Sequence, residues 1–292
     1  MKLHTLFICT ALFIAAAVFV PSAGYAQQKE IDSTATALLF NGLKEYNSGN
    51  YGKAREHLQK LAAISPNNDA AYYYLANIAI KSDDAPSGEL YLKKGIELDP
   101  ENFWYRETLG QLYIKHNKIA EAIKIYEELL EMYPKKSAVY YSLVNLYLGT
   151  QQTTQAKEML EKIEAVQGKS EAIAMTYYNI FRMEQDWEKA LNYLVEFDKE
   201  FNSPRIACVI GDMYANRYKD SLAIIYYNKA LDADKECAPA MYGKAEVHRS
   251  NGNFAGFFAD ITPFFAAPSI DPKMKIEYMK QLFQIPNFIK RF

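Results

Sequence analysis

Four primary amides recur along the sequence, each 34 residues after the previous one. They are Asn77, Gln111, Asn145 and Asn179. A primary amide carries two donor hydrogens and an acceptor oxygen, so a row of amides that faces one way can hold the backbone of an extended peptide. Alternatively, each amide forms a hydrogen bond between neighbouring helices. The first interpretation predicts peptide recognition, and the second predicts a structural role.

Elsewhere the sequence has no pattern that indicates catalysis or metal binding. His57, His116 and His248 are widely separated and lack the spacing of metal ligands. The stretch "GKS" at 168–170 lacks the glycine that a phosphate-binding loop has five residues earlier, because Ile163 stands there. We therefore expect a protein that is not an enzyme and that needs no cofactor or metal.

The elements that must position the amides are short helices in a repeated arrangement. Two series of mostly small residues share the 34-residue step and one shortening to 33. They are Ala54, Gly88, Ala122, Ala156, Ala190, Ala223, and Gly42, Ala76, Gly110, Val144, Tyr178, Gly211, Ala245. Apolar residues between these markers have helical spacing, and helices that cross closely need a small residue at the crossing. We expect an all-α solenoid of about six to seven helical hairpins.

The third of these units carries the clearest motifs. It contains "LGQLY" followed by "AEAIKIYEELLEMYP", and "IELDPEN" precedes it. These motifs resemble the tetratricopeptide repeat (TPR) family, and the resemblance covers residues 35–268. It implies a right-handed superhelix whose first helices line a concave, non-catalytic groove for a peptide or protein. Tyr178 replaces a small residue and Phe257 an alanine of the family pattern, so we expect a less regular superhelix near 170–180 and after 250.

Projection of the first helices onto such a groove places aromatic and charged residues around the amides. Aromatic side chains with a polar group are frequent in binding hot spots, although the same rings can pack helix seams. The expected partner-binding groove consists of Tyr73, Asn77, Trp104, Glu107, Gln111, Tyr141, Asn145, Asn179 and Arg182, with Tyr242 nearby.

Residues 1–26 have the features of an export signal. Lys2 precedes an apolar run over 6–20, which is short of the roughly 20 residues that span a bilayer. The small residues Gly24 and Ala26 fit a cleavage site after Ala26. We expect a periplasmic or secreted protein that is not a lipoprotein, with a linker over 27–34; an uncleaved anchor is the alternative. A net charge of -2 without a basic tract argues against a nucleic-acid partner and leaves a protein or peptide of the cell envelope.

Cys208 and Cys237 are the cysteines that remain after such cleavage. An exported protein would fold where disulfides form. Pairing also requires Cα atoms within about 7 Å of each other, and the sequence favours two buried thiols over a bridge.

The pattern changes after residue 254, where phenylalanines become frequent and a last apolar helix is expected over 269–292. The terminal repeats of an array are normally polar outside. Three interpretations stay open: the chain is the front part of a longer array, its end docks onto a partner or a second copy, or it touches a membrane. The candidate interface consists of Phe257, Phe258, Phe264, Phe265, Phe288 and Ile289.

Overall fold

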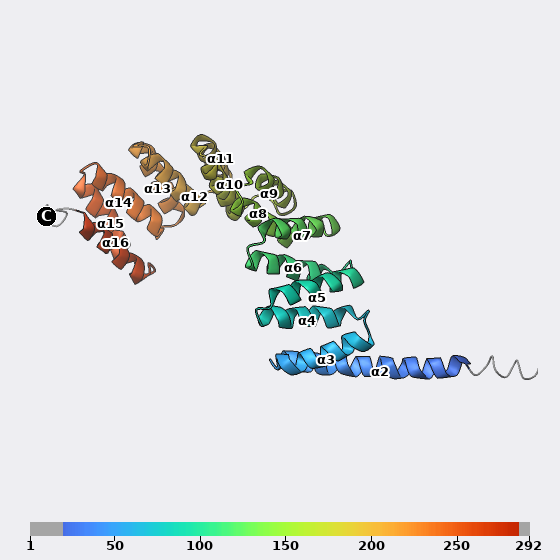
Figure 1. The fold of residues 1–292 in the computed structure, drawn as a ribbon. Coiled ribbons are helices and arrows are strands. Elements are labelled where there is room, and N and C mark those ends of the chain that lie inside the picture. Colours follow the sequence, from blue (N-terminus) through green and yellow to red (C-terminus); the bar gives the residue numbers. More distant parts are fainter. Residues whose placement is uncertain (1–19, 286–292) are drawn as a thin grey trace, which may run out of the picture. The chain divides into compact units, whose positions relative to one another are not determined.

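The computed structural model describes residues 20–285, with side chains from residue 29 onwards. This range contains fifteen helices joined by short turns (Figure 1). By its internal contacts the chain divides into two compact units, with the boundary between Leu146 and Tyr147 inside α8.

The first unit holds three helical hairpins and most of α8. Its helices are α2 (Val20–Asn47), α3 (Tyr51–Ile64), α4 (Asp69–Lys81), α5 (Ala85–Leu98), α6 (Phe103–Lys115), α7 (Ile119–Met132) and α8 (Ser137–Gly149). The helices pair in chain order as α2–α3, α4–α5 and α6–α7. Residues 27–34, the expected linker, lie within the helix α2.

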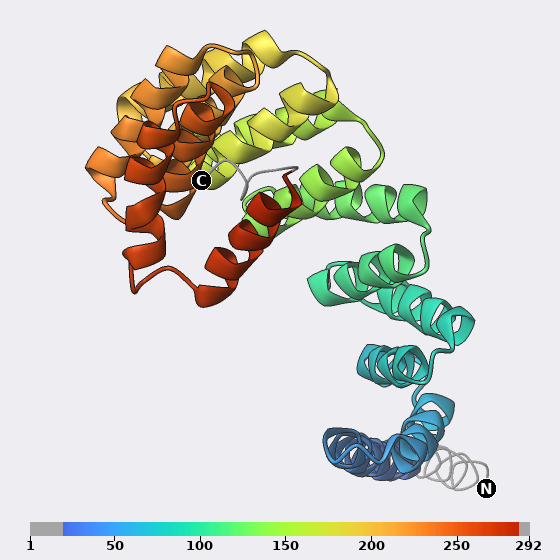
Figure 2. The same ribbon diagram turned by 90° about the vertical axis from the view of Figure 1, so that its left-hand side faces the viewer.

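The second unit holds three hairpins that stack side by side in chain order, with one helix before them and a terminal helix after them (Figure 2). Its helices are α9 (Thr153–Gln167), α10 (Glu171–Met183), α11 (Trp187–Phe201), α12 (Pro204–Ala215), α13 (Asp220–Ala233), α14 (Ala238–Ser250), α15 (Phe254–Ala266) and α16 (Pro272–Gln284). The fifteen described helices form the predicted all-α array of about seven hairpins.

Each hairpin turn contains one residue with a left-handed backbone at the same repeat position. The residues are Gly49, Asp83, Asn117, Gln151, Gln185, Tyr218 and Gly252, with φ between 56 and 78 degrees. Glycine adopts this region without strain, whereas a bulky side chain makes it costly. Tyr218, with φ of 57 degrees, is therefore the unusual member of the set.

The core forms where side chains of the two helices in each hairpin interdigitate. Four residues after each small residue of the second helices, a large side chain is buried: Leu58, Leu92, Tyr126, Leu160, Leu194 and Tyr227. Near 170–180, α10 and α11 are uninterrupted helices, and Tyr178 packs on the cluster that contains Leu194. In α15, Phe257 is 1% exposed and serves as a core residue.

The two ends of the chain bear on the expectations about export and assembly. Within residues 20–285, none of the helices combines the length and the apolar character needed to cross a bilayer. Most of the expected export signal lies outside the described residues. The expected last helix is α16, which presents Met274, Ile276, Met279 and Phe283 to solvent.

Candidate partner-binding surfaces

In the first unit, the structure shows what the amides of the expected groove contact. The half-buried Asn77 donates from Nδ2 to the carbonyl oxygen of Tyr73, 2.9 Å away and one turn earlier in α4. The exposed Gln111 donates from Nε2 to Oε1 of Glu107 in α6, at 2.8 Å. Asn145 in α8 is exposed. Both bonds lie within one helix, so they are not the bonds between neighbouring helices that the structural interpretation required.

The aromatic residues of the expected groove differ in exposure. Trp104 is 59% exposed, and Tyr141 is 38% exposed. Tyr73 is half-buried, with its ring centre 5.1 Å from that of Tyr105 on the next first helix. Trp104 and Tyr141 therefore present part of their rings to solvent, while Tyr73 packs the seam between α4 and α6.

Asn179 and Arg182 belong to the second unit, so the nine predicted groove residues are divided between the two units. Both are exposed on α10 and line a shallow hollow of about 550 Å³ together with Trp187. The Arg182 guanidinium carbon lies 5.5 Å from the centre of the Tyr178 ring, within the range of a cation–π contact.

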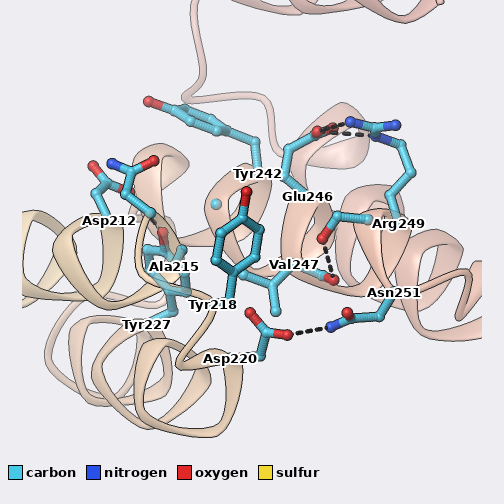
Figure 3. Close-up of a pocket in the computed structure, with 13 residues that line it drawn as sticks. Asp212, Ala215, Tyr218, Asp220, Tyr227, Tyr242, Glu246, Val247, Arg249 and Asn251 are labelled. Atoms are coloured by element: carbon cyan, nitrogen blue, oxygen red, sulfur yellow. Dashed lines mark hydrogen bonds and ion pairs between the residues drawn. The ribbon is translucent and has the colours of Figure 1, made fainter.

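The repeat position of the amides continues in the second unit with two carboxylates. Asp212 directly follows Gly211, and Glu246 directly follows Ala245, as each amide follows its own member of that series. The amide pattern ends at Asn179, although the series of small residues, which continues through Gly211 and Ala245, already marks both positions. Asp212 and Glu246 line a cavity of about 560 Å³ between α12 and α14 (Figure 3).

Tyr227 of α13 positions the carboxylate of Asp212. The Tyr227 hydroxyl donates to Oδ1 of Asp212 at 2.6 Å, and its ring is 2% exposed. The ring fits because Gly211 and Gly243 lack side chains: a Cβ on either would lie 2.7 Å from a ring carbon. Burial raises the pKa of Tyr227, so its hydroxyl remains a donor. The cavity walls remove part of the water around Asp212 and raise its pKa, although the residue stays open to cavity solvent.

The other acidic residues of this cavity have close partners. Oε2 of Glu246 accepts two hydrogen bonds from Arg249, at 2.6 and 2.9 Å. Its Oε1 accepts a hydrogen bond from the Tyr278 hydroxyl at 2.5 Å. Asp220 accepts a hydrogen bond from Nδ2 of Asn251 at 2.7 Å.

Two cysteines lie in the same hairpin region. Cys208 and Cys237 are both buried and free, with their sulfur atoms 3.4 Å apart. The hydrogen bond from Cys208 lowers the pKa of Cys237 to about 7. Since both thiols are buried, neither is part of an exposed surface. In residues 20–285 no group of three or more His, Cys, Asp or Glu side chains is arranged to hold a metal ion.

The phenylalanines of the expected C-terminal interface fall into two sets. Phe257 and Phe264 are each 1% exposed and form the core of α14, α15 and α16, so they cannot contact a partner without unfolding. Phe258 is 42% exposed, and it lines an apolar hollow with Phe265 and Leu282. Phe288 and Ile289 lie outside the described residues.

Comparisons with known proteins agree with this architecture. A family model described as a tetratricopeptide repeat matches residues 46–112 and 113–177. The C-terminal part of a TPR repeat-containing protein from Cytophaga hutchinsonii has a TM-score of 0.55 and 15% identity, covering 80% of this chain and 97% of that one. The structure of Naa15/Naa10 bound to HypK-THB has a TM-score of 0.53 and 13% identity, and the match covers 87% of this chain and 43% of that one.

A tetratricopeptide repeat protein from Parabacteroides merdae has a TM-score of 0.49 and 16% identity, covering 85% of this chain and 98% of that one. Among curated proteins, none matches the sequence. At these identities the two structures with TM-scores of 0.55 and 0.53 show a shared fold and no more.

Proposed function

Because the chain is a tetratricopeptide repeat protein, a class that generally serves as a protein-protein interaction scaffold, we propose that it holds a peptide or protein partner on its first helices without catalysing a reaction. The observation that supports this proposal is the recurrence of exposed recognition groups beside buried packing residues. Gln111 and Asn145 are exposed, whereas the residues just before them, Gly110 and Val144, are buried.

The proposal places the partner in the bacterial cell envelope. Its support is the sequence of residues 1–26, with a basic start, a short apolar run and small residues before Gln27. An exported chain cleaved there would be a periplasmic protein without a lipid anchor. N-terminal sequencing of the chain from its producing cells tests this: a start at Gln27 supports export, and an intact Met1 contradicts cleavage.

Capture of the partner in living cells tests the binding surface. The groove variant changes Asn77, Tyr141 and Asn145 together to alanine, all on first helices of the first unit. The matched control changes Glu97, Lys124 and Glu131, which are exposed on the second helices α5 and α7. After cross-linking and mass spectrometry, we expect a protein that wild type and control capture and that the groove variant loses.

Thermal stability decides how that result is interpreted. Tyr141 and Asn145 are exposed and Asn77 bonds only within its own helix, so the groove variant should melt close to wild type. Partners retained at wild-type level by the groove variant would contradict the proposed surface. A large drop in melting temperature would show that these side chains pack the core instead.

A second candidate function is assembly through the C-terminal end, as a structural subunit or as the front part of a longer array. The exposed apolar side chains Phe258, Met279 and Phe283 around two hollows on α15 and α16 favour it. Sedimentation of the purified chain tests self-association. Changing Phe258 and Phe283 to serine should abolish it, and these positions are suitable because, unlike Phe264, they are exposed. A monomeric wild-type chain would exclude self-association.

A further inference from the structure

We propose that the cavity between α12 and α14 binds a basic side chain, arginine or lysine, of the partner protein. This inference rests on the proposed function, because the cavity is lined by first-helix positions of the second unit. It adds the chemistry of the group that is recognised.

The charges of the cavity wall point to a cation. Three carboxylates line the cavity, from Asp212, Asp220 and Glu246, against one cationic side chain, Arg249. Two nitrogens of Arg249 donate hydrogen bonds to Glu246. Among the described residues, Asp212 has no lysine, arginine or histidine as an ion-pair partner. An anionic ligand would meet uncompensated negative charge here, whereas a cation would neutralise it.

Asp212 is held in place before any ligand arrives. Its Oδ1 accepts the hydrogen bond from Tyr227, whose ring is fixed between Gly211 and Gly243. A carboxylate has two acceptor oxygens, so Oδ2 can accept from an ammonium or guanidinium group. A positioned acceptor loses little rotational freedom on binding, and that lowers the entropic cost of the contact.

Tyr218 supplies an aromatic surface at the edge of the same cavity. Its side chain is 92% exposed, and its backbone has the left-handed conformation that other hairpin turns give to Gly, Asp, Asn or Gln. Residues held in such strained conformations cluster at functional sites. Figure 3 shows Tyr218 among the side chains that line this cavity with Asp212 and Glu246. A ring beside a carboxylate suits an arginine side chain, which stacks on aromatic faces while its nitrogens donate.

Two peptide probes that differ only in charge test the cavity. One is an acetylated and amidated Ala-Ala-Arg-Ala-Ala peptide, and the other carries citrulline, an uncharged isostere, at the central position. A lysine peptide shows whether a planar guanidinium is preferred. Titrated into the isotopically labelled purified chain, the arginine peptide should shift the amide resonances of 216–220 and 246–251. We expect it to bind at least about tenfold more tightly than the citrulline peptide.

Variants connect this binding to the named residues. Asp212→Asn keeps an oxygen that accepts from Tyr227 but removes the charge, and should weaken the arginine peptide about tenfold. Asp232→Asn makes the same change of charge on the exposed surface of α13, outside the cavity, and should leave binding unchanged. Tyr218→Ala removes a side chain that is 92% exposed, so it should weaken binding without changing the melting temperature.

Equal binding of the arginine and citrulline peptides, no binding of either, or full binding by Asp212→Asn would overturn the inference. If Asp212→Asn unfolds, the inference is tested by the binding of the arginine peptide to Tyr218→Ala and by the difference in affinity between the arginine and citrulline peptides. Failure here is distinguishable from failure of the proposed function. The cellular cross-linking experiment uses substitutions in the first unit, and a partner captured there would establish scaffold function whatever this cavity binds.

Discussion

Two hairpins of this array share the same glycine and tyrosine but differ in the residue beside the glycine. In α6–α7, Tyr126 packs on Gly110, and a Cβ there would lie 2.8 Å from its ring. In α12–α13, Tyr227 packs on Gly211 in the same way. Gln111 follows the first glycine, and Asp212 follows the second.

The two tyrosine hydroxyls differ in their hydrogen bonding accordingly. The Tyr227 hydroxyl donates to Asp212 at 2.6 Å. The Tyr126 hydroxyl is buried and makes no hydrogen bond of ordinary geometry among the described residues, although the side chains of Gln111 and Ser142 lie near it; Gln111 donates its amide hydrogen to Glu107. A buried hydroxyl without a partner costs free energy. The same packing unit is therefore a destabilising feature in one hairpin and the support of a carboxylate in the other.

The largest expected effects come from adding a methyl group at the glycines. Gly211→Ala and Gly243→Ala each press on the buried ring of Tyr227, while Gly110→Ala presses on Tyr126. Overpacking of this kind costs about 1–3 kcal/mol in free energy of unfolding. Because Tyr227 is confined by glycines on both sides, the double variant Gly211→Ala with Gly243→Ala should be the least stable in urea denaturation.

Two further variants serve as controls for this result. Gly52→Ala adds a methyl group in α3 where no atom lies within 4 Å, so its stability should be unchanged or higher. Tyr227→Leu, which copies the residue at this position in four other hairpins, should restore part of the stability lost in Gly211→Ala. If Gly211→Ala were as stable as Gly52→Ala, the ring would not be confined as described.

Removing each tyrosine hydroxyl tests the comparison directly, with a smaller effect. Tyr227→Phe leaves Asp212 without its donor and should lower the free energy of unfolding by about 1 kcal/mol. Tyr126→Phe removes a buried group that makes no hydrogen bond of ordinary geometry among the described residues, so stability should be unchanged or rise. Urea denaturation of both variants measures the difference. Equal losses would mean that the Tyr126 hydroxyl has a partner that the static structure does not show.

The architecture could be predicted from the sequence because each hairpin repeats the same steric requirement. Small residues at fixed steps marked the helix crossings, and the all-α array of about seven hairpins and the tetratricopeptide repeat motifs are confirmed. The division inside α8 could not be predicted, since the repeat pattern continues unbroken from Val144 to Tyr178.

The candidate sites were less accessible to sequence reasoning, for two physical reasons. Whether Gln111 turns toward Glu107 or toward Tyr126 depends on rotamers, which no spacing encodes. By contrast, Phe257, Ile261 and Phe264 share one helical face, so their burial could have been read from the spacing. The groove residues themselves stay a prediction until a partner is identified.

The smallest expected effects concern acid stability, where a carboxylate of each unit responds in the opposite sense. In the first unit, Glu89 accepts hydrogen bonds from Lys118, Lys93 and Tyr113, and these lower its pKa from 4.5 to about 2. Its contribution to stability is therefore present above pH 4.5 and is lost as the pH falls toward 2. Because the group is partly open to solvent, we expect under about 1 kcal/mol.

Asp212 in the second unit has a pKa raised above 3.8, so its contribution favours folding below pH 3.8 and is lost as the pH rises through the folded value. Melting curves recorded between pH 7 and 2 should separate the two groups. Glu89 loses its stabilising contribution as the pH falls, so in Glu89→Gln the melting temperature should fall less steeply with decreasing pH. Asp212 gains a stabilising contribution over the same range, so in Asp212→Asn the melting temperature should fall more steeply. Slopes that change in the same direction would show that solvent reaches both carboxylates equally, and that the cavity wall does not desolvate Asp212.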